Sequence, residues 1–332
     1  MSTNSSESTT SPANRAYAID LLRFLAITMV ILVHTTNFPP GRFGVQVFFA
    51  VSGYLLFAGA QKSVRTFLIR RSFRLFPLWL VMLVSWTLIS EQFSSIEILS
   101  SIFLFNNFVP LSGIVPGGWS ISAEWIFSLL IVVIVMIPNR KIAFFGLLVF
   151  SIVFQFLSGL FVYMRGGIDS TTSPEIYEFY SYLNTTNPLN NLAFFLLGLG
   201  LKAGYLPQIK QKLFLAIMMV IPVFVEFLIG HVMFLWFGFV YCLFTYTLNA
   251  KLIIKFKLIT LIGQRTYGLY FGHFVVICIS DSILPSTILD NSIPYFLTVY
   301  LFSFVFATFT WYVIESPFLK LSQKITGTHK KH

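Results

Sequence analysis

Residues 20–34 contain an apolar run that is interrupted by a charge. Apart from Arg23 and Thr28, residues 21–33 are apolar, which predicts the body of a transmembrane helix. Arg23 and His34 are eleven residues apart, so both side chains project from one helix face, roughly 16 Å apart along the axis. An ionisable group inside a bilayer is costly and usually faces a protein interior or a wet cavity. The helix therefore predicts a polar channel that runs inward from one membrane surface.

Two other interpretations of these residues stay open. Arg23 lies a few residues from the polar N-terminal segment, and its long side chain could reach the membrane interface. A single His in a membrane helix can also be a hydrogen-bonding packing residue, without any role in chemistry.

The composition of the chain indicates a polytopic membrane protein. Of its 332 residues, 56% are hydrophobic and 10% are charged, whereas a soluble domain carries about 25% charged residues. We expect an all-α transmembrane bundle of about ten helices. The segment 98–111 is apolar but short, so we expect it to be interfacial or re-entrant. The expected helices span residues 17–37, 44–60, 75–90, 119–138, 142–163, 189–202, 212–230, 232–249, 259–280 and 293–315.

The basic residues predict the orientation of the bundle. With the N-terminus inside, nineteen of the 22 Lys and Arg residues fall on the inner side, and only Arg42 and Arg165 fall in outer loops. Cytoplasmic loops carry such an excess, so we expect both termini in the cytoplasm. We expect a disordered tail at 1–14, a transmembrane domain at 15–318 and a basic tail at 319–332. The net charge of +10 then comes mostly from basic residues that mark the cytoplasmic side, and no nucleic-acid partner is expected.

Polar and small residues interrupt the expected second helix. Ser52 and Gly53 form a small pair that lets a neighbouring helix approach closely, and packing alone accounts for them. Gln46 lies near the outer end of this helix, at about the level of His34, and is a candidate site residue.

Arg70, Arg71 and Arg74 precede the expected third helix on the cytoplasmic side. Such a cluster commonly anchors the topology or contacts lipid headgroups. It could instead grip phosphates bidentately, which Arg does better than Lys.

The expected fourth helix opens with Trp119, Ser122 and Glu124, after two glycines. Glu124 is its only carboxylate and lies a few residues inside the outer end. A carboxylate at this depth could orient a histidine, hold its proton or bind an acceptor hydroxyl. Alternatively, it could stabilise the N-terminus of its own helix by interacting with the macrodipole.

Tyr267, Tyr270 and His273 repeat at every third position of the expected ninth helix and form one polar stripe. The sequence contains no HExxH or CxxC pattern, no Walker-type loop and no GxSxG turn. We therefore expect no metal.

Together, these blocks resemble the acyltransferase-3 family of integral-membrane acyltransferases. Arg23 followed after ten residues by His34 is similar to the Arg-x10-His signature of that family. Further blocks resemble the family in the same order, at residues 44–56, 70–80, 119–124, 262–273 and 314–317. The similarity extends over nearly the whole chain, from 20 to 317.

The resemblance implies a ten- or eleven-helix bundle that moves an acyl group, often acetyl, onto a hydroxyl of an envelope sugar. It implies an acyl-CoA donor, with acetyl-CoA expected, and a carbohydrate or glycolipid acceptor. The surroundings would be membrane lipid, in the inner (cytoplasmic) membrane of a bacterium. Some members carry a fused extracytoplasmic esterase-like domain, and none is expected in this sequence. Residues 139–258 show no motif that can be compared.

An alcohol that attacks a thioester needs a base for its proton and stabilisation of an oxyanion. We expect His34 to be the base, since a neutral imidazole accepts protons near pH 7, and Glu124 to orient it or take up charge. The expected donor-binding residues are Arg23, Arg70, Arg71 and Arg74. Other candidates for the site are Gln46, Ser52, Trp119, Ser122, Tyr267, Tyr270 and His273.

A different functional class also fits. A transporter or translocator of an envelope sugar or a lipid-linked precursor, without acyl chemistry, would equally need many helices and buried charges. The sequence shows no inverted repeat, which argues against this alternative.

Overall fold

A computed structural model shows an all-helical protein, without strands in the described residues (12–36, 38–89, 93–106, 113–165, 176, 179–180, 182–209, 220, 233–250, 255–283 and 292–327). The helices are α1 (Pro12–Thr36), η1 (Pro39–Phe43), α2 (Gly44–Lys62), α3 (Val64–Ile89), α4 (Ser95–Ile102), α5 (Gly118–Met136), α6 (Arg140–Met164), η2 (Tyr182–Thr186), α8 (Pro188–Ala203), α10 (Met233–Asn249), α11 (Lys257–Gln264), α12 (Thr266–Ile283), α14 (Ser292–Thr310), η3 (Trp311–Glu315) and α15 (Ser316–Ile325).

Most of the expected helices coincide with helices of the structure, and the one at 212–230 lies, apart from residue 220, outside the described residues. The third helix begins at Val64 and not near residue 75, so its arginines lie inside α3. The helix expected at 259–280 is interrupted at Arg265, because α11 packs against α1 whereas α12 packs against α14. The described part of 98–111 begins with the end of α4, whose eight residues are too few to cross a bilayer.

The boundaries expected for the terminal tails differ from the helix ends. α1 already begins at Pro12, inside the expected tail 1–14. At the other end, α15 continues to Ile325 and carries part of the expected basic tail 319–332 as helix.

Six segments of the described chain are long and apolar enough to cross a membrane. They are Ala13–Thr36, Gly44–Lys62, Val64–Ile89, Gly118–Met136, Arg140–Met164 and Ile293–Ile325. α8 and α10 are shorter, with 16 and 17 residues. The chain thus has the character of a multi-pass membrane protein.

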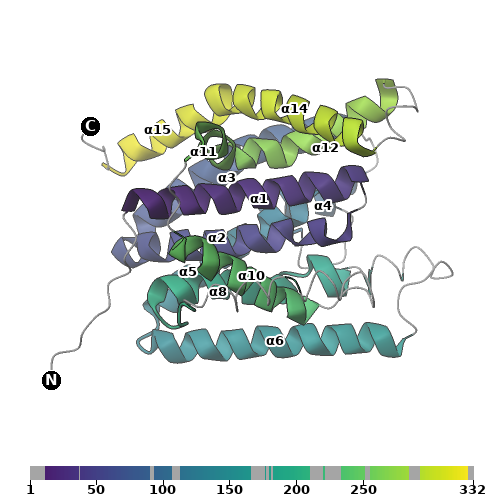
Figure 1. Cartoon of the computed structure of the whole chain (residues 1–332). Coiled ribbons are helices and arrows are strands. Elements are labelled where there is room, and N and C mark those ends of the chain that lie inside the picture. The colour runs from purple at the N-terminus through teal and green to yellow at the C-terminus, as the bar shows by residue number, and fades with distance from the viewer. Residues whose placement is uncertain are drawn as a thin grey trace.

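α1 runs through the middle of the bundle (Figure 1). It contacts α2 on one side and α11, α12 and α14 on the other. α2 packs in turn against α8, and α6 covers α8 at the edge of the bundle. The start of α1 and the end of α15 lie at the same end of the bundle (Figure 1).

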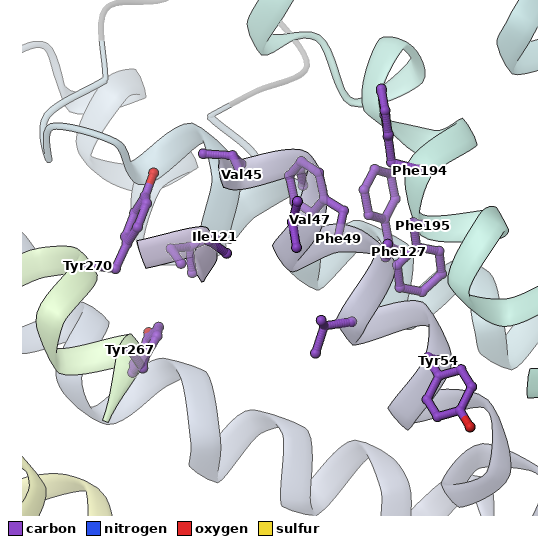
Figure 2. Close-up of a cluster of buried hydrophobic side chains, with 14 of the residues drawn as sticks. Val45, Val47, Phe49, Tyr54, Ile121, Phe127, Phe194, Phe195, Tyr267 and Tyr270 are labelled. Carbon is purple, nitrogen blue, oxygen red and sulfur yellow. The ribbon is translucent and has the colours of Figure 1, made fainter. Parts of the chain in front are cut away.

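The tightest crossing in this arrangement joins α2 to α8. A Cβ atom on Gly53 would lie 1.9 Å from the carbonyl oxygen of Phe195, and one on Gly198 would lie 1.8 Å from that of Ala50. The two backbones therefore touch directly, as small residues allow in membrane helices. The expectation that Ser52-Gly53 lets a helix approach closely is confirmed. Aromatic rings fill the space beside this crossing, with Phe49, Phe127, Phe194 and Phe195 gathered in Figure 2.

Gly198→Ala should destabilise the bundle, because the new methyl group meets backbone that cannot move aside. Overpacking of this kind costs about 1–3 kcal/mol. The matched control is Gly146→Ala in α6, where nothing lies within 4 Å of the added Cβ. Thermal unfolding of both variants in detergent, followed by size-exclusion chromatography, measures the effect. Equal unfolding temperatures would contradict the close approach of α2 and α8.

Candidate active site

A cavity of about 110 Å³ lies between α1, α2, α3, α5 and the start of α12. Its two sides differ in chemistry. α2 supplies a mostly apolar wall, formed by Val45, Phe48, Phe49, Val51, Leu55 and Leu56 beside Ser52. The other four helices supply polar and charged groups, namely Arg23, Arg71, Arg74, Ser120, Glu124, Thr266, Tyr267 and Tyr270.

An ion pair between α3 and α5 forms the centre of the polar side. Nη2 of Arg71 lies 2.7 Å from Oε1 of Glu124, and the two side chains are only 9% and 18% exposed. The Nε of Arg71 also donates to Oγ of Ser128 at 3.0 Å. Ser52 donates a hydrogen bond from α2 to the same Oε1 of Glu124. Three helices thus meet at one carboxylate.

The local sequence of α5 explains why these groups meet. Ser120, Glu124 and Ser128 are four residues apart and lie on one helix face. Ser128 also bonds to the backbone carbonyl of Glu124, at 2.7 Å, which holds its hydroxyl toward Arg71. Because α3 extends back to Val64, Arg71 and Arg74 are three residues apart on one helix and both reach the cavity.

Arg74 has a carboxylate partner of its own. Its Nη1 lies 2.7 Å from Oε2 of Glu315, whose side chain is buried. Glu315 ends η3, a short π-helical stretch between α14 and α15. Such stretches frequently occur at functional sites because they redirect single side chains. The guanidinium of Arg74 also lies over the rings of Tyr267 and Trp311, at 5.5 and 5.8 Å from their centroids.

Of the three arginines on the cavity wall, Arg23 lies farthest from its nearest carboxylate. It lies near the middle of the 25-residue α1, so reaching the membrane interface is not required to explain its position. Its nearest carboxylate is Asp20, one turn earlier, at 3.6 Å, compared with 2.7 Å for the pairs of Arg71 and Arg74. The side chain is 30% exposed. A negatively charged group that entered the cavity would therefore meet Arg23 most easily.

Two tyrosines of α12 complete the polar side. The hydroxyl of Tyr267 donates to the carbonyl of Leu75 in α3, at 2.6 Å. The hydroxyl of Tyr270 donates to the carbonyl of Gly117 at 3.0 Å and accepts from Ser120 at 2.8 Å. Figure 2 shows both tyrosines on the side facing Ile121. These bonds fix α12 against α3 and α5.

His34 lies outside this cavity. It is exposed near the end of α1, and its ring centroid is 5.4 Å from that of His273 and 5.0 Å from that of Phe274. His273 is fully buried, with Nδ1 3.3 Å from the carbonyl of Leu269. The Tyr270 ring, at 5.7 Å from that of His273, separates the histidine pair from the cavity. In the described structure Glu124 bonds to Arg71 and Ser52, and not to His34.

The remaining candidates do not line the cavity. Gln46 is buried and donates to Asn191 of α8 at 3.0 Å, and Ser122 is buried and donates to Asn106. Trp119 packs with its ring centroid 6.2 Å from that of Phe49. Arg70 is exposed on α3. These contacts give Gln46, Ser122 and Trp119 packing roles.

Some cavity groups were not predicted as site residues from the sequence. Ser120 and Ser128 could have been found from their four-residue spacing around Glu124. Thr266 precedes the tyrosine stripe. Glu315 offers no such signal, because its partner Arg74 lies 241 residues away. Among the described residues, no group of three His, Cys, Asp or Glu side chains could hold a metal ion.

Replacing Arg71 by Met should destabilise the protein, because it leaves the carboxylate of Glu124 without its cation. Leaving a buried polar group unsatisfied costs about 1–3 kcal/mol. A second change, Glu124→Gln, should recover most of that loss, since a neutral amide needs no counter-charge. Thermal unfolding of the two single variants and the double variant measures the coupling. Arg65→Met, an exposed cation of the same helix outside the cavity, serves as the control. Additive effects would contradict a direct ion pair.

Comparison with known proteins identifies the family of this chain. Residues 16–312 match a family model described as an acyltransferase domain. Relatives include proteins of Staphylococcus aureus strains COL, MSSA476 and N315, each named "Putative O-acetyltransferase". Each is 26% identical over 371 residues, covering 91% of this chain and 57% of the relative, so the chain spans little more than half their length. No solved structure gives a significant match. Since the matched domain covers nearly the whole chain, the protein belongs to the acyltransferase-3 family.

Proposed function

We propose that the protein is a membrane O-acyltransferase that moves an acyl group, acetyl in the simplest case, from acyl-CoA to a hydroxyl of an envelope carbohydrate or glycolipid. The family assignment supports acyl transfer and argues against a transporter without chemistry. The observation that carries the proposal is the two-sided cavity. Its charged side suits a polar reacting centre, and its apolar wall suits an acyl chain.

The cavity has room for a short acyl thioester beside its charged groups. We place the nucleotide of CoA outside it, toward the exposed Arg70. Acyl transfer needs a proton acceptor and groups that stabilise the oxyanion. We assign the first role in the cavity to Glu124 and the second to Arg23.

We place the protein in the inner membrane of a bacterium. In the orientation proposed from the basic residues, the start of α3 lies at the cytoplasmic face. Acyl-CoA would approach from there. Arg70 is exposed on α3 and would contact the donor's phosphates outside the cavity. His34, exposed near the opposite end of α1, would hydrogen-bond the acceptor sugar at the outer side, outside the cavity.

The central test is CoA release by purified protein supplied with acetyl-CoA and bacterial envelope glycans. We expect thiol release together with acetylated glycan, detected by mass spectrometry. Glu124→Gln should abolish both. Uptake of the glycan into proteoliposomes without CoA release would favour a transporter and overturn the proposal.

A donor without phosphates distinguishes the role of Arg70 from that of Arg23. Arg70→Ala should raise KM for acetyl-CoA by up to about tenfold, the effect of losing one charge-assisted contact. It should leave KM unchanged for an acetyl thioester of N-acetylcysteamine, which has no phosphates. Arg23→Ala should impair both donors, and Arg23→Lys should restore activity only in part, because an ammonium lacks the planar fork of Arg.

The control for these variants is Lys141→Ala, an exposed cation of α6 outside the cavity. KM for acetyl-CoA should not change in this variant. An equal effect of Arg70→Ala on both donors would contradict a phosphate contact.

His34→Ala should raise KM for the glycan by up to about tenfold, the effect of losing one hydrogen bond to the acceptor. Folding should be unaffected, because the side chain is exposed. Thr36→Ala, two residues later on α1, is the control, since its hydroxyl bonds back to Leu32. Initial rates at varied glycan concentration measure the effect, and an unchanged KM in His34→Ala would remove this residue from acceptor binding.

A further inference from the structure

The hydroxyl of Ser52 bonds to a carboxylate of another helix, unlike several hydroxyl groups in the membrane helices of this protein. Thr28, Thr35 and Ser85 each donate to the carbonyl four residues earlier, which satisfies the hydroxyl within its own helix. The hydroxyl of Ser52 instead bonds to the carboxylate of Glu124, on the wall of the cavity. This serine therefore presents its oxygen to a base.

The groups around Ser52 have the arrangement of an activated nucleophile. Such a site has a hydroxyl hydrogen-bonded to a base, and the base is oriented by a third group. Here Glu124 is the base, and Arg71 holds it at 2.7 Å. Arg71 is itself held by Ser128 at 3.0 Å. The close backbone contact of the adjacent Gly53 with Phe195 fixes the position of α2 at this point.

The cavity also provides space and charge for the reacting group. An acyl carbon beside Ser52 would have the apolar residues of α2 around its chain and Arg23 on the polar side. A guanidinium in a partly desolvated cavity can stabilise the oxyanion of a tetrahedral intermediate. In the part of the chain that the structure describes, no other serine on the cavity wall bonds to a carboxylate. Ser120 bonds to Tyr270 and to Gly117.

We propose that Ser52 is the nucleophile and carries the acyl group as an ester between two half-reactions, an inference that rests on the proposed function. In the first, Oγ of Ser52 attacks the thioester carbon and its proton passes to Glu124. The C–S bond breaks, and the CoA thiolate takes that proton and leaves as a thiol. In the second, the acceptor hydroxyl attacks the Ser52 ester and its proton passes to Glu124, which returns that proton to Oγ of Ser52 as the ester C–O bond breaks.

A covalent intermediate separates the two substrates in time. In a direct transfer the thioester and the acceptor hydroxyl would have to reach the same cavity together. With the acyl group on Ser52, the donor leaves before the acceptor hydroxyl arrives. Only the acyl group then has to occupy the middle of the bundle.

The test is to incubate the full-length protein in nanodiscs with acetyl-CoA carrying a labelled acetyl group, without acceptor. We expect up to one equivalent of label on the peptide that contains Ser52, with release of an equal amount of CoA. The label should be stable to neutral hydroxylamine and labile to alkali, as an oxygen ester is. Adding envelope glycan should discharge it. Initial rates with both substrates should follow ping-pong kinetics.

Variants separate a nucleophile from a residue that only positions Glu124. Ser52→Ala should take up no label and should lower transfer by more than about a hundredfold. Ser52→Cys should take up label as a thioester, which neutral hydroxylamine removes. The bond that holds the label would then change with the residue at position 52. Ser85→Ala, an exposed serine of α3 outside the cavity, should behave as wild type.

The outcomes distinguish this inference from the proposed function. Suppose that the glycan is acetylated with the intersecting kinetics of a ternary complex and that residue 52 carries no label, as Ser or as Cys. This result would overturn the covalent role of Ser52 and leave the acyltransferase function intact. Label on a different residue would also overturn it. Absence of CoA release both with and without glycan would count against the acyltransferase function, and the inference would fall with it.

Discussion

The ion pair between Arg71 and Glu124 is the interaction on which the centre of the bundle depends. Neither charge could remain inside an apolar helix bundle without the other, because an unpaired charge in this environment is costly. The pair joins α3 to α5, and the hydrogen bond from Ser52 joins α2 to the same carboxylate. One interaction thereby determines how three helices face each other.

The charged centre is stable because packing around it leaves little freedom. Direct backbone contact at Gly53 and Gly198 fixes α2 against α8, and aromatic rings fill the adjacent space. On the other side, Tyr267 and Tyr270 bond to backbone carbonyls of α3 and of the turn before α5. Association of helices in lipid relies on such packing and interhelical bonds, because lipid is as apolar as the side chains. A preorganised polar cavity can then form without collapse of its walls.

The cavity and the histidine pair are separate features that the proposed reaction must connect. The described structure has Glu124, Ser52 and Arg23 around the cavity, whereas His34 lies with His273 and Phe274 beyond Tyr270. A direct transfer would require donor and acceptor to lie in the cavity together. A covalent acyl carrier on Ser52 removes this requirement, because the donor leaves before the acceptor hydroxyl arrives.

The sequence by itself determined the family, the all-helical membrane class and most helix positions, because apolar length and ordered motifs are local properties of a chain. It also identified Arg23, Arg71, Arg74, Glu124 and the α12 tyrosines as candidates, since ionisable groups inside apolar runs stand out. Only the tertiary structure decided which of them meet. Glu124 pairs with Arg71 and not with His34, and Arg74 pairs with Glu315, 241 residues away. Partners between distant helices depend on how those helices pack, and no local pattern in the sequence encodes that choice.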